Sequence, residues 1–415
     1  MTLSEELAWR GFVNQTTFKD IKRVDGDPIT FYFGVDPSAS SMTVGNLAAA
    51  MMVRLFAKYG HRPVLLVGGA TGLIGDPDGK ADERNLKTPD EVAANKHAIA
   101  AQYQIVLGTY SFTLVDNYDW FKDMGYLQFL REVGKHVPLR QMVQRDFVQS
   151  RISEDGSGIS YAEFSYVLIQ AYDFVHLYRE EGVTLQLCGS DQWGNSIAGV
   201  DLIRRLEGGE AHVWSLPLVV NKATGKKFGK SEEGAVWLDP DRTTPTAFYQ
   251  FWINVDDEGV EDYLKIYTEL EKGEIERIME AHRADRAARI AQTHLAREVT
   301  RLVHGEETME FAEVVTGYLV GRTPIAEASE TVLEAIRQEM PAVTSAADGD
   351  IAAALLASGL AESLTEARRL LGGNAIAVNG QKINRPTFEP ADFVDGRLLL
   401  RKGKKYKDSA LVELA

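Results

Sequence analysis

Three polar side chains stand at helical spacing in the segment "SYVLIQAYDF". Tyr166, Gln170 and Asp173 lie at positions i, i+4 and i+7, so a phenol, an amide and a carboxylate share one face of a helix predicted over residues 160–180. Val, Leu, Ile and Phe flank them, and buried polar groups are costly unless they are paired. The segment therefore indicates either a helix surface facing water or the wall of a polar ligand site.

The segment "TLQLCGSDQWGN" favours the ligand site. Its apolar strand ends at Gly189 and Ser190 and then presents Asp191 and Gln192 at the start of a helix, which is where a parallel sheet binds its ligand. Carboxylates and amides that converge near an aromatic side chain suit the ammonium and the hydroxyl of one small molecule. A free amino acid fits this description.

Two glycine-rich segments add further candidates. "VGGATGLIGDPDGK" matches neither common nucleotide-binding fingerprint, so Asp76 is predicted to contact a substrate amine or hydroxyl. "KKFGKSEEG" places Lys227, Lys230 and Ser231 in a glycine-flanked loop. Mobile ammonium groups suit phosphoryl or nucleotidyl transfer, because negative charge develops on the departing oxygens. The alternative for this second segment is an exposed basic loop without function.

The elements that must position these residues alternate between strand and helix. Strand patterns over 29–35, 62–69, 112–117 and 183–189 enclose helix patterns over 44–60 and 90–107. This alternation predicts an α/β fold with a Rossmann-like parallel-sheet catalytic domain over residues 1–243. We expect an α-helical domain over 244–320, a linker over 321–349 and a small α+β unit over 350–415.

The small C-terminal unit resembles an RNA-binding module. It combines a helix with a capping box, an Asn-Gly hairpin turn and a basic segment, "RLLLRKGKKYK". A solvated tail is the alternative for the basic segment. The residues predicted to bind RNA are basic side chains of the helix and of this segment: Arg368, Arg369, Arg401, Lys402, Lys404 and Lys405.

Composition excludes several classes of protein. The 415-residue chain has 45% hydrophobic and 25% charged residues, and no apolar run is long enough to cross a bilayer. The net charge of −15 argues against broad adhesion to nucleic acid but leaves room for local basic surfaces. A single cysteine excludes an internal disulfide and a cysteine zinc cluster. We also expect no protein-bound metal. No secretory signal is visible, and we expect a cytoplasmic protein.

Taken together and in this order, "GGATGLIGDPDGK", "EFSYVLIQAYDF", "GSDQWGN" and "KFGKS" resemble the bacterial tyrosyl-tRNA synthetases, which are class I aminoacyl-tRNA synthetases. The resemblance covers essentially the whole chain. It implies a ligase that activates L-tyrosine with ATP, accompanied by Mg²⁺, and transfers the tyrosyl group to tRNA(Tyr). It also implies a homodimer and an S4-like RNA-binding domain over residues 350–415.

The resemblance assigns roles to residues of this sequence. It implies a mobile phosphate-binding set of Lys80, Arg84, Lys227, Lys230 and Ser231, and an ATP ribose held by Asp191. The sequence leaves open which pocket carboxylate meets the phenol and which meets the amine. The implied tyrosine pocket is lined by Tyr32, Asp76, Tyr166, Gln170, Asp173 and Gln192.

One segment departs from the family pattern. Where the family has His-x-Gly-His or His-x-Gly-Asn at the start of a helix under the ATP, "DPSASSMTVGN" has Thr43, Gly45 and Asn46. Gly45 and Asn46 suit a nucleotide at a helix N-terminus, and Thr43 and Ser38 offer hydroxyl donors in place of the histidine. The departure leaves open a slower enzyme or an RNA-binding paralogue that has lost activation. A nucleotide-dependent oxidoreductase is disfavoured, because the dinucleotide fingerprint is missing.

Overall fold

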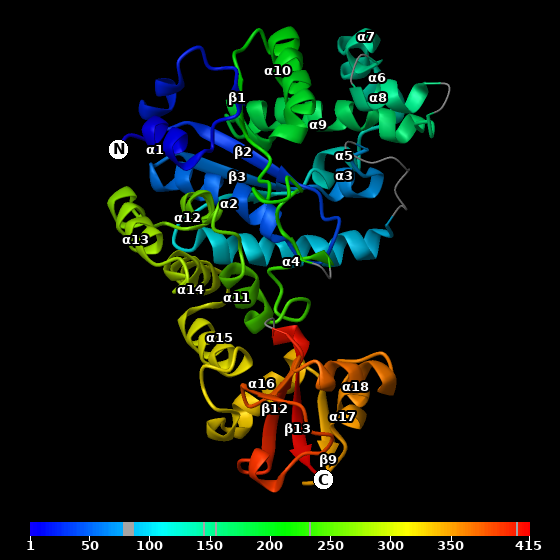
Figure 1. Ribbon diagram of the computed structural model, residues 1–415. Coiled ribbons are helices and arrows are strands. Elements are labelled where there is room, and N and C mark those ends of the chain that lie inside the picture. Colours follow the sequence, from blue (N-terminus) through cyan, green and yellow to red (C-terminus); the bar gives the residue numbers. More distant parts are fainter. Residues whose placement is uncertain (78–86, 144–145, 154–155, 232–233, 404–405) are drawn as a thin grey trace. The chain divides into compact units, whose positions relative to one another are not determined.

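A six-stranded sheet forms the centre of the first of two units into which the chain divides (Figure 1). The structure is a computed structural model that describes residues 1–77, 87–143, 146–153, 156–231, 234–403 and 406–415. The first unit comprises Met1–Thr243 and Ile253–Val303, and the second comprises Thr244–Trp252 and His304–Ala415.

The strands of the first unit follow the order β1-β6-β5-β2-β3-β4. All neighbouring pairs are parallel except β1 and β6, which are antiparallel. The order changes direction at β2, so the carboxyl ends of β2 and β5 meet at a point where such sheets bind ligands. The strands are β1 (Gln15–Thr16), β2 (Thr30–Val35), β3 (Arg62–Val67), β4 (Thr113–Val115), β5 (Leu185–Gly189) and β6 (His212–Leu216), with a separate hairpin of β7 (Lys230–Ser231) and β8 (Gly234–Ala235).

Helices cover both faces of this sheet. Successive side chains of a strand point to opposite faces, so neighbouring residues of one strand pack against different helices. On β2 the Phe31 ring packs against Phe56 of α2, with ring centroids 5.4 Å apart, whereas Tyr32 packs against Phe174 of α9 at 5.1 Å. The predicted α/β fold class is confirmed. The main covering helices are α2 (Val44–Lys58), α4 (Pro89–Leu107), α9 (Tyr161–Glu180) and α10 (Trp193–Glu207).

Further helices complete the unit. They are α1 (Leu3–Arg10), η1 (Ile21–Asp25), α3 (Gly69–Ile74), α5 (Tyr118–Phe121), α6 (Tyr126–Glu132), η2 (Gly134–His136), α7 (Leu139–Val143), α8 (Asp146–Ile152), η3 (Ser190–Gln192), α12 (Val260–Tyr267), α13 (Lys272–Ala284) and, apart from its last residue, α14 (Ile290–His304).

The second unit is built on a five-stranded sheet of order β11-β10-β12-β13-β9, in which β9 and β13 are parallel and the other pairs antiparallel. Its strands are β9 (Ala342–Ser345), β10 (Ile376–Val378), β11 (Gln381–Ile383), β12 (Arg397–Arg401) and β13 (Ser409–Leu414). Its helices are α11 (Pro245–Ile253, apart from its last residue), α15 (Glu306–Leu319), η4 (Ile325–Glu327), α16 (Glu330–Glu339), α17 (Ile351–Ala357), α18 (Leu364–Gly372), η5 (Pro390–Asp392) and η6 (Tyr406–Asp408).

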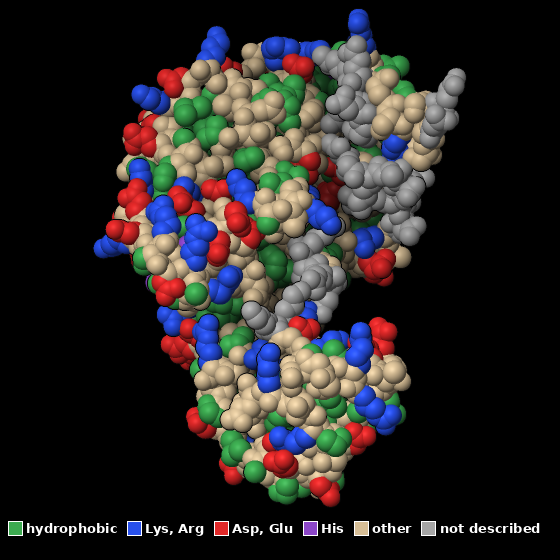
Figure 2. Space-filling model, viewed as in Figure 1, with side chains coloured by type: hydrophobic (Ala, Val, Ile, Leu, Met, Phe, Trp, Pro, Cys, Tyr) green, Lys and Arg blue, Asp and Glu red, His purple; other side chains and the backbone are tan. Residues whose placement is uncertain are grey.

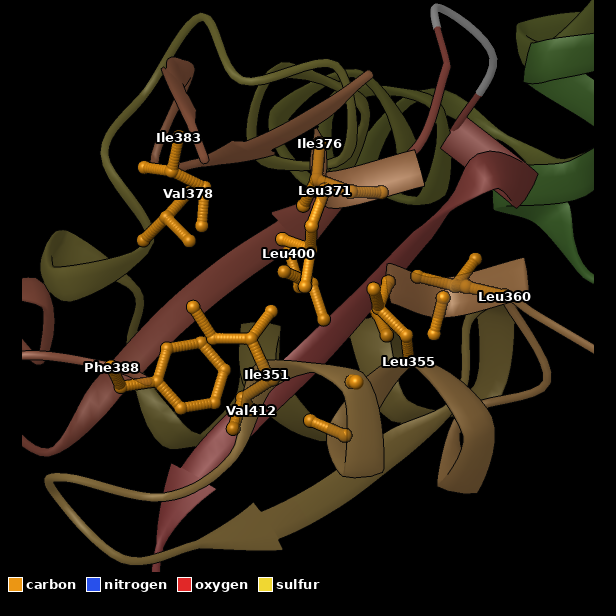
Figure 3. Close-up of a cluster of buried hydrophobic side chains, with 14 of the residues drawn as sticks. Ile351, Leu355, Leu360, Leu371, Ile376, Val378, Ile383, Phe388, Leu400 and Val412 are labelled. Carbon is orange, nitrogen blue, oxygen red and sulfur yellow. The ribbon is translucent and has the colours of Figure 1, made fainter. Parts of the chain in front are cut away.

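Both faces of this second sheet are apolar. Leu400 points into a core formed with α17 and α18, which includes Leu355 and Leu371 (Figure 3). The neighbouring Leu399 points the opposite way and is buried with Leu333 of α16. Because β12 is apolar on both sides, helices must cover it on both sides.

Two segments lie in packing units other than those that the expected domain limits suggest. Residues 321–349, expected to be a linker, contain α16 and β9, and both belong to the second unit. Residues 253–303, expected to lie in a separate helical domain, belong to the first unit, which contains the six-stranded sheet. The limits of the functional domains stay a prediction, because packing units and functional domains need not coincide.

Candidate active site

A cavity of about 310 Å³ opens at the carboxyl ends of β2 and β5, between α2 and α9. The structure brings together residues that the sequence places far apart. The predicted site residues that line the cavity are Tyr32, Ser38, Thr43, Gly45, Asn46, Asp76, Tyr166, Gln170, Asp173, Asp191, Gln192 and Lys227.

Four residues predicted for the active site have no described side chain. Lys230 and Ser231 form β7, but only their backbone is described. Lys80 and Arg84 lie outside the described residues. Their assignment to a mobile phosphate-binding set stays a prediction.

The closed end of the cavity holds Tyr32 and Asp173, both almost fully buried. The Asp173 carboxylate accepts hydrogen bonds from Asn117 Nδ2 at 3.1 Å and Trp120 Nε1 at 2.9 Å. Burial outweighs these bonds and raises the pKa of Asp173 well above its ordinary range. Burial, followed by the charge of Asp173, also raises the pKa of Tyr32.

Three polar atoms in the cavity wall lack a partner within the described part of the chain. They are the Tyr32 hydroxyl, Gln170 Oε1 and Gln186 Oε1, and all three are buried. An unpaired buried polar group costs about 1–3 kcal/mol, so native structures rarely keep one without a reason. All three atoms are available to a ligand in the cavity.

The other end of the cavity carries two further carboxylates. The Tyr166 hydroxyl donates to Asp36 Oδ2 at 2.7 Å, and burial, followed by the charges of Asp36 and Asp76, raises the pKa of Tyr166. The Gln192 amide donates to Asp76. Its carbonyl oxygen accepts from Asn195 Nδ2 at 3.0 Å, which fixes the direction in which the Gln192 amide points. Two carboxylates and the unpaired Gln170 oxygen suit a cationic group.

The start of α2 lies at the rim of the cavity and is held by a capping box. Thr43 is the N-cap, and its hydroxyl accepts from the Asn46 backbone N–H at 3.4 Å. The same hydroxyl donates to Asn46 Oδ1 at 2.8 Å. The Thr43 hydroxyl is therefore engaged within the helix cap, whereas the sequence suggested a donor directed at the ATP.

The "KFGKS" segment is joined to this helix start by backbone contacts. Val44 N–H donates to the Val236 carbonyl at 3.0 Å, and Val236 N–H donates to the Gly229 carbonyl at 3.0 Å. Gly229 has φ +93°, and a Cβ there would lie 3.0 Å from Gly45 N. Only glycine fits this close approach. The neighbouring Phe228 stacks on Tyr263 with ring centroids 4.2 Å apart, while Lys227 is exposed.

Sequence reasoning missed several cavity-side residues. Asp36 comes directly after β2 and Asn117 two residues after β4, and a polar residue within two positions of the end of a parallel strand is the signal that could have identified them. In the glycine-dense segment, the backbone N–H groups at the start of α3 are occupied by side chains. Gly69 N–H donates to Asp116 Oδ1 at 2.9 Å, and Ala70 N–H donates to Asn117 Oδ1 at 2.7 Å.

The predicted RNA-binding residues fall into two groups. Arg368 and Arg369 are exposed on α18. In contrast, Arg401 donates to the Val320 carbonyl at 2.9 Å, and Lys402 Nζ donates to the Leu360 carbonyl at 2.8 Å. On the face shown in Figure 2, positive and negative side chains of this unit are interspersed. Lys404 and Lys405 lie outside the described residues.

Among the described residues, no group of three or more His, Cys, Asp or Glu side chains is arranged to hold a metal ion. None of the helices described is both long enough and apolar enough to span a bilayer.

Comparison with protein families identifies the class of this chain. Residues 24–317 match the model for tRNA synthetases class I (W and Y), and residues 332–407 match the tyrosine–tRNA ligase SYY-like C-terminal domain. The chain therefore belongs to the class I tRNA synthetases of the tryptophan and tyrosine type.

Individual relatives narrow this class to the tyrosine branch. A tyrosine–tRNA ligase from Limosilactobacillus reuteri is 41% identical over 414 residues, which cover 98% of each chain. One from Yersinia enterocolitica is 43% identical and covers 97% of each chain. The crystal structure of a C-terminally truncated mitochondrial tyrosyl-tRNA synthetase from Aspergillus nidulans has a TM-score of 0.69 at 30% identity, covering 77% of this chain and 94% of that one. The predicted resemblance to bacterial tyrosyl-tRNA synthetases is confirmed.

Proposed function

We infer that this chain activates L-tyrosine with ATP and then transfers the tyrosyl group to the 3′ end of tRNA in translation. In the first step the tyrosine carboxylate attacks the α-phosphate of ATP, pyrophosphate leaves and tyrosyl-adenylate forms. In the second step the terminal ribose hydroxyl of the tRNA displaces AMP. No side chain has to become covalent, so catalysis depends on positioning and on stabilising charge.

Beyond family membership, one observation supports tyrosine as the amino acid. The closed end of the cavity holds an unpaired, buried hydroxyl on Tyr32 beside the carboxyl of Asp173. A phenol placed there forms hydrogen bonds with both groups. A phenylalanine ring leaves both without a partner, which costs free energy.

We propose that the two ends of the cavity divide the substrate between them. The phenol is neutral and suits the closed end, where burial raises the pKa of Asp173. The ammonium suits the other end, where Asp76 supplies negative charge and the Tyr166 and Gln170 oxygens can accept hydrogen bonds. In this arrangement Gln192 faces the carboxylate that reacts.

ATP is proposed to bind along the start of α2. A helix N-terminus favours phosphate, and Gly45 permits a close approach. Asp191, which also lines the cavity, is proposed to hold the ribose, and Ser38 lies on the same rim. Mg²⁺ is proposed to accompany ATP. Lys227 and the predicted Lys230, Lys80 and Arg84 are proposed to neutralise the charge of the departing pyrophosphate, and Ser231 is proposed to donate a hydrogen bond to it.

We propose that the C-terminal unit binds tRNA(Tyr). The match to a tyrosine–tRNA ligase C-terminal domain and the exposed Arg368 and Arg369 on α18 support this proposal. Arg401 and Lys402 are proposed to contribute less to tRNA binding, because their side chains already donate hydrogen bonds to backbone carbonyl groups of the same unit. A role in translation supports a cytoplasmic location.

We propose that the protein is a homodimer. Tyr126 and Leu127 on α6 are 62% and 79% exposed, and Tyr161 at the start of α9 is 61% exposed. The hydroxyl groups of Tyr126 and Tyr161 lie 3.3 Å apart, so these side chains form one surface. An exposed apolar surface of this kind is typical of an interface. Leu127→Asp should lower the mass measured by light scattering to that of one chain, and Leu356→Asp on the exposed side of α17 should not.

Transfer of labelled amino acids to tRNA tests the proposed function. The purified protein should attach tyrosine to bacterial tRNA in the presence of ATP and should attach neither phenylalanine nor tryptophan. A protein that binds tRNA without attaching any amino acid would instead be a paralogue that has lost activation.

A further inference from the structure

Thr43 and Asn46 are joined by three hydrogen bonds at the rim of the active-site cavity. The Thr43 backbone N–H donates to Asn46 Oδ1 at 2.9 Å, and the Thr43 hydroxyl donates to the same oxygen at 2.8 Å. The Asn46 backbone N–H donates back to the Thr43 hydroxyl at 3.4 Å. Both residues line the cavity.

These bonds determine which way the Asn46 amide points. A backbone N–H can only donate, so the Asn46 atom facing Thr43 must be the carbonyl oxygen Oδ1. The amide nitrogen Nδ2 must then face the opposite way. Within the described structure it donates to no protein group. An exposed asparagine ordinarily samples several rotamers, and the two bonds to Oδ1 restrict this one to a single orientation.

Two other backbone N–H groups at the start of α2 already have acceptors within the protein. Val44 N–H donates to the Val236 carbonyl, and Asn46 N–H donates to Thr43. In the part of the chain that the structure describes, Gly45 N–H and Asn46 Nδ2 are left as the donors of this helix start that can meet an anionic ligand.

We propose that Thr43 is a positioning residue for the activation step, which holds the Asn46 amide so that Nδ2 donates to a phosphate oxygen of ATP. The proposal rests on the proposed function. A histidine at this position could offer its own ring N–H to the nucleotide. Thr43 instead directs both of its donors at Asn46, and Asn46 makes the contact. With threonine in place of histidine, the hydrogen-bond donors at the helix start are arranged differently, and the helix start still presents a donor to ATP.

A purely structural helix cap is the competing explanation, and the chain contains a matched control for it. Thr88 caps α4 with the same three bonds, donating to Glu91 Oε2 from its N–H at 2.8 Å and its hydroxyl at 2.9 Å, and accepting from Glu91 N–H at 3.2 Å. Thr88 does not line the active-site cavity. Thr88→Val should therefore lower stability as Thr43→Val does, without slowing activation.

The test is a double-mutant cycle of Thr43→Val and Asn46→Ala in tyrosine-dependent ATP–pyrophosphate exchange. Thr43→Val should lower kcat about 10-fold with the KM for tyrosine unchanged, since a misplaced donor costs rate. Thr43→Ser keeps both donors and should recover most of the rate. In an Asn46→Ala background, Thr43→Val should slow exchange no further, because the side chain that it positions is gone.

The cycle separates the two explanations because Asn46→Ala retains the backbone N–H that Thr43 caps. A purely structural cap predicts the same rate loss from Thr43→Val in both backgrounds, and that result would overturn the proposal. So would a Thr43→Val variant that exchanges at the unmodified rate. If the unmodified protein shows no tyrosine-dependent exchange, the proposed function fails and the inference fails with it.

Discussion

Replacing Tyr32 by phenylalanine removes one oxygen atom and should move stability and selectivity in opposite directions. The Tyr32 hydroxyl is buried, 1% of the residue is exposed, and it has no hydrogen-bond partner among the described residues. A buried hydroxyl without a partner costs about 1–3 kcal/mol by comparison with mutational data. Because Tyr32→Phe leaves no protein group newly unpaired, the variant should be about 1 kcal/mol more stable to urea in the absence of ligand.

The same substitution should weaken the choice of tyrosine over phenylalanine. If the substrate phenol bonds to Tyr32, the variant loses one neutral hydrogen bond, of about 0.5–1.5 kcal/mol, so the ratio of kcat/KM for tyrosine to that for phenylalanine should fall about 2- to 13-fold. The assay is ATP–pyrophosphate exchange with each amino acid, and the two ratios are compared at the same ATP concentration.

Tyr103→Phe is a matched control for this prediction. The Tyr103 hydroxyl is also buried and lacks a partner among the described residues, but Tyr103 lies on α4, packs behind Phe33 and does not itself line the cavity. It should gain stability as Tyr32→Phe does and keep its selectivity. A Tyr32→Phe variant that is less stable than the parent, or whose selectivity is unchanged, would show that the Tyr32 hydroxyl is not an unpaired group awaiting the substrate phenol.

Two other predictions concern the lysine loop and the N-terminal helix. Gly229→Ala should slow exchange about 10-fold, because a Cβ there would press on the start of α2, whereas Gly225→Ala, with open space around it, should keep most of the rate. Equal rates for the two variants in an exchange assay would contradict this role. Glu6→Gln should lower the free energy of unfolding by about 1–3 kcal/mol at pH 7. Burial raises the pKa of Glu6, but hydrogen bonds from Tyr59 and Arg10 outweigh it and lower the pKa overall. The contribution of Glu6 is therefore complete above its ordinary pKa and is lost as the pH falls through the lower folded value, so urea titrations should show the difference shrinking in acid. A difference that stays constant with pH would show that charge is not its cause.

Much of the cavity could be predicted from local spacing. Tyr166, Gln170 and Asp173 share a helix face whatever the rest of the chain does, and strand ends in a parallel sheet converge at one edge. The residues that complete the site, such as Asn117 and Trp120 around Asp173, come from other elements. Their contact depends on how α5 and α9 pack, which no local pattern in the sequence encodes.

Charge and composition were weaker guides than spacing. The basic segment near the C-terminus suggested one RNA-binding set, but Arg401 and Lys402 hold carbonyl groups of their own unit. A run of lysine and arginine does not tell which side chains reach solvent. Residues 321–349 looked like a linker because Gly, Pro, Ser and Ala occur there without a regular hydrophobic period. Their helix is needed because Leu399 faces the second side of a sheet that has apolar residues on both.

The decisive experiment for tyrosine activation is ATP–pyrophosphate exchange with each of the standard amino acids in turn. It measures activation alone, so neither tRNA identity nor the C-terminal unit affects the result. We expect exchange with tyrosine and at most background exchange with phenylalanine and tryptophan. Exchange driven by another amino acid, or by none, would contradict it.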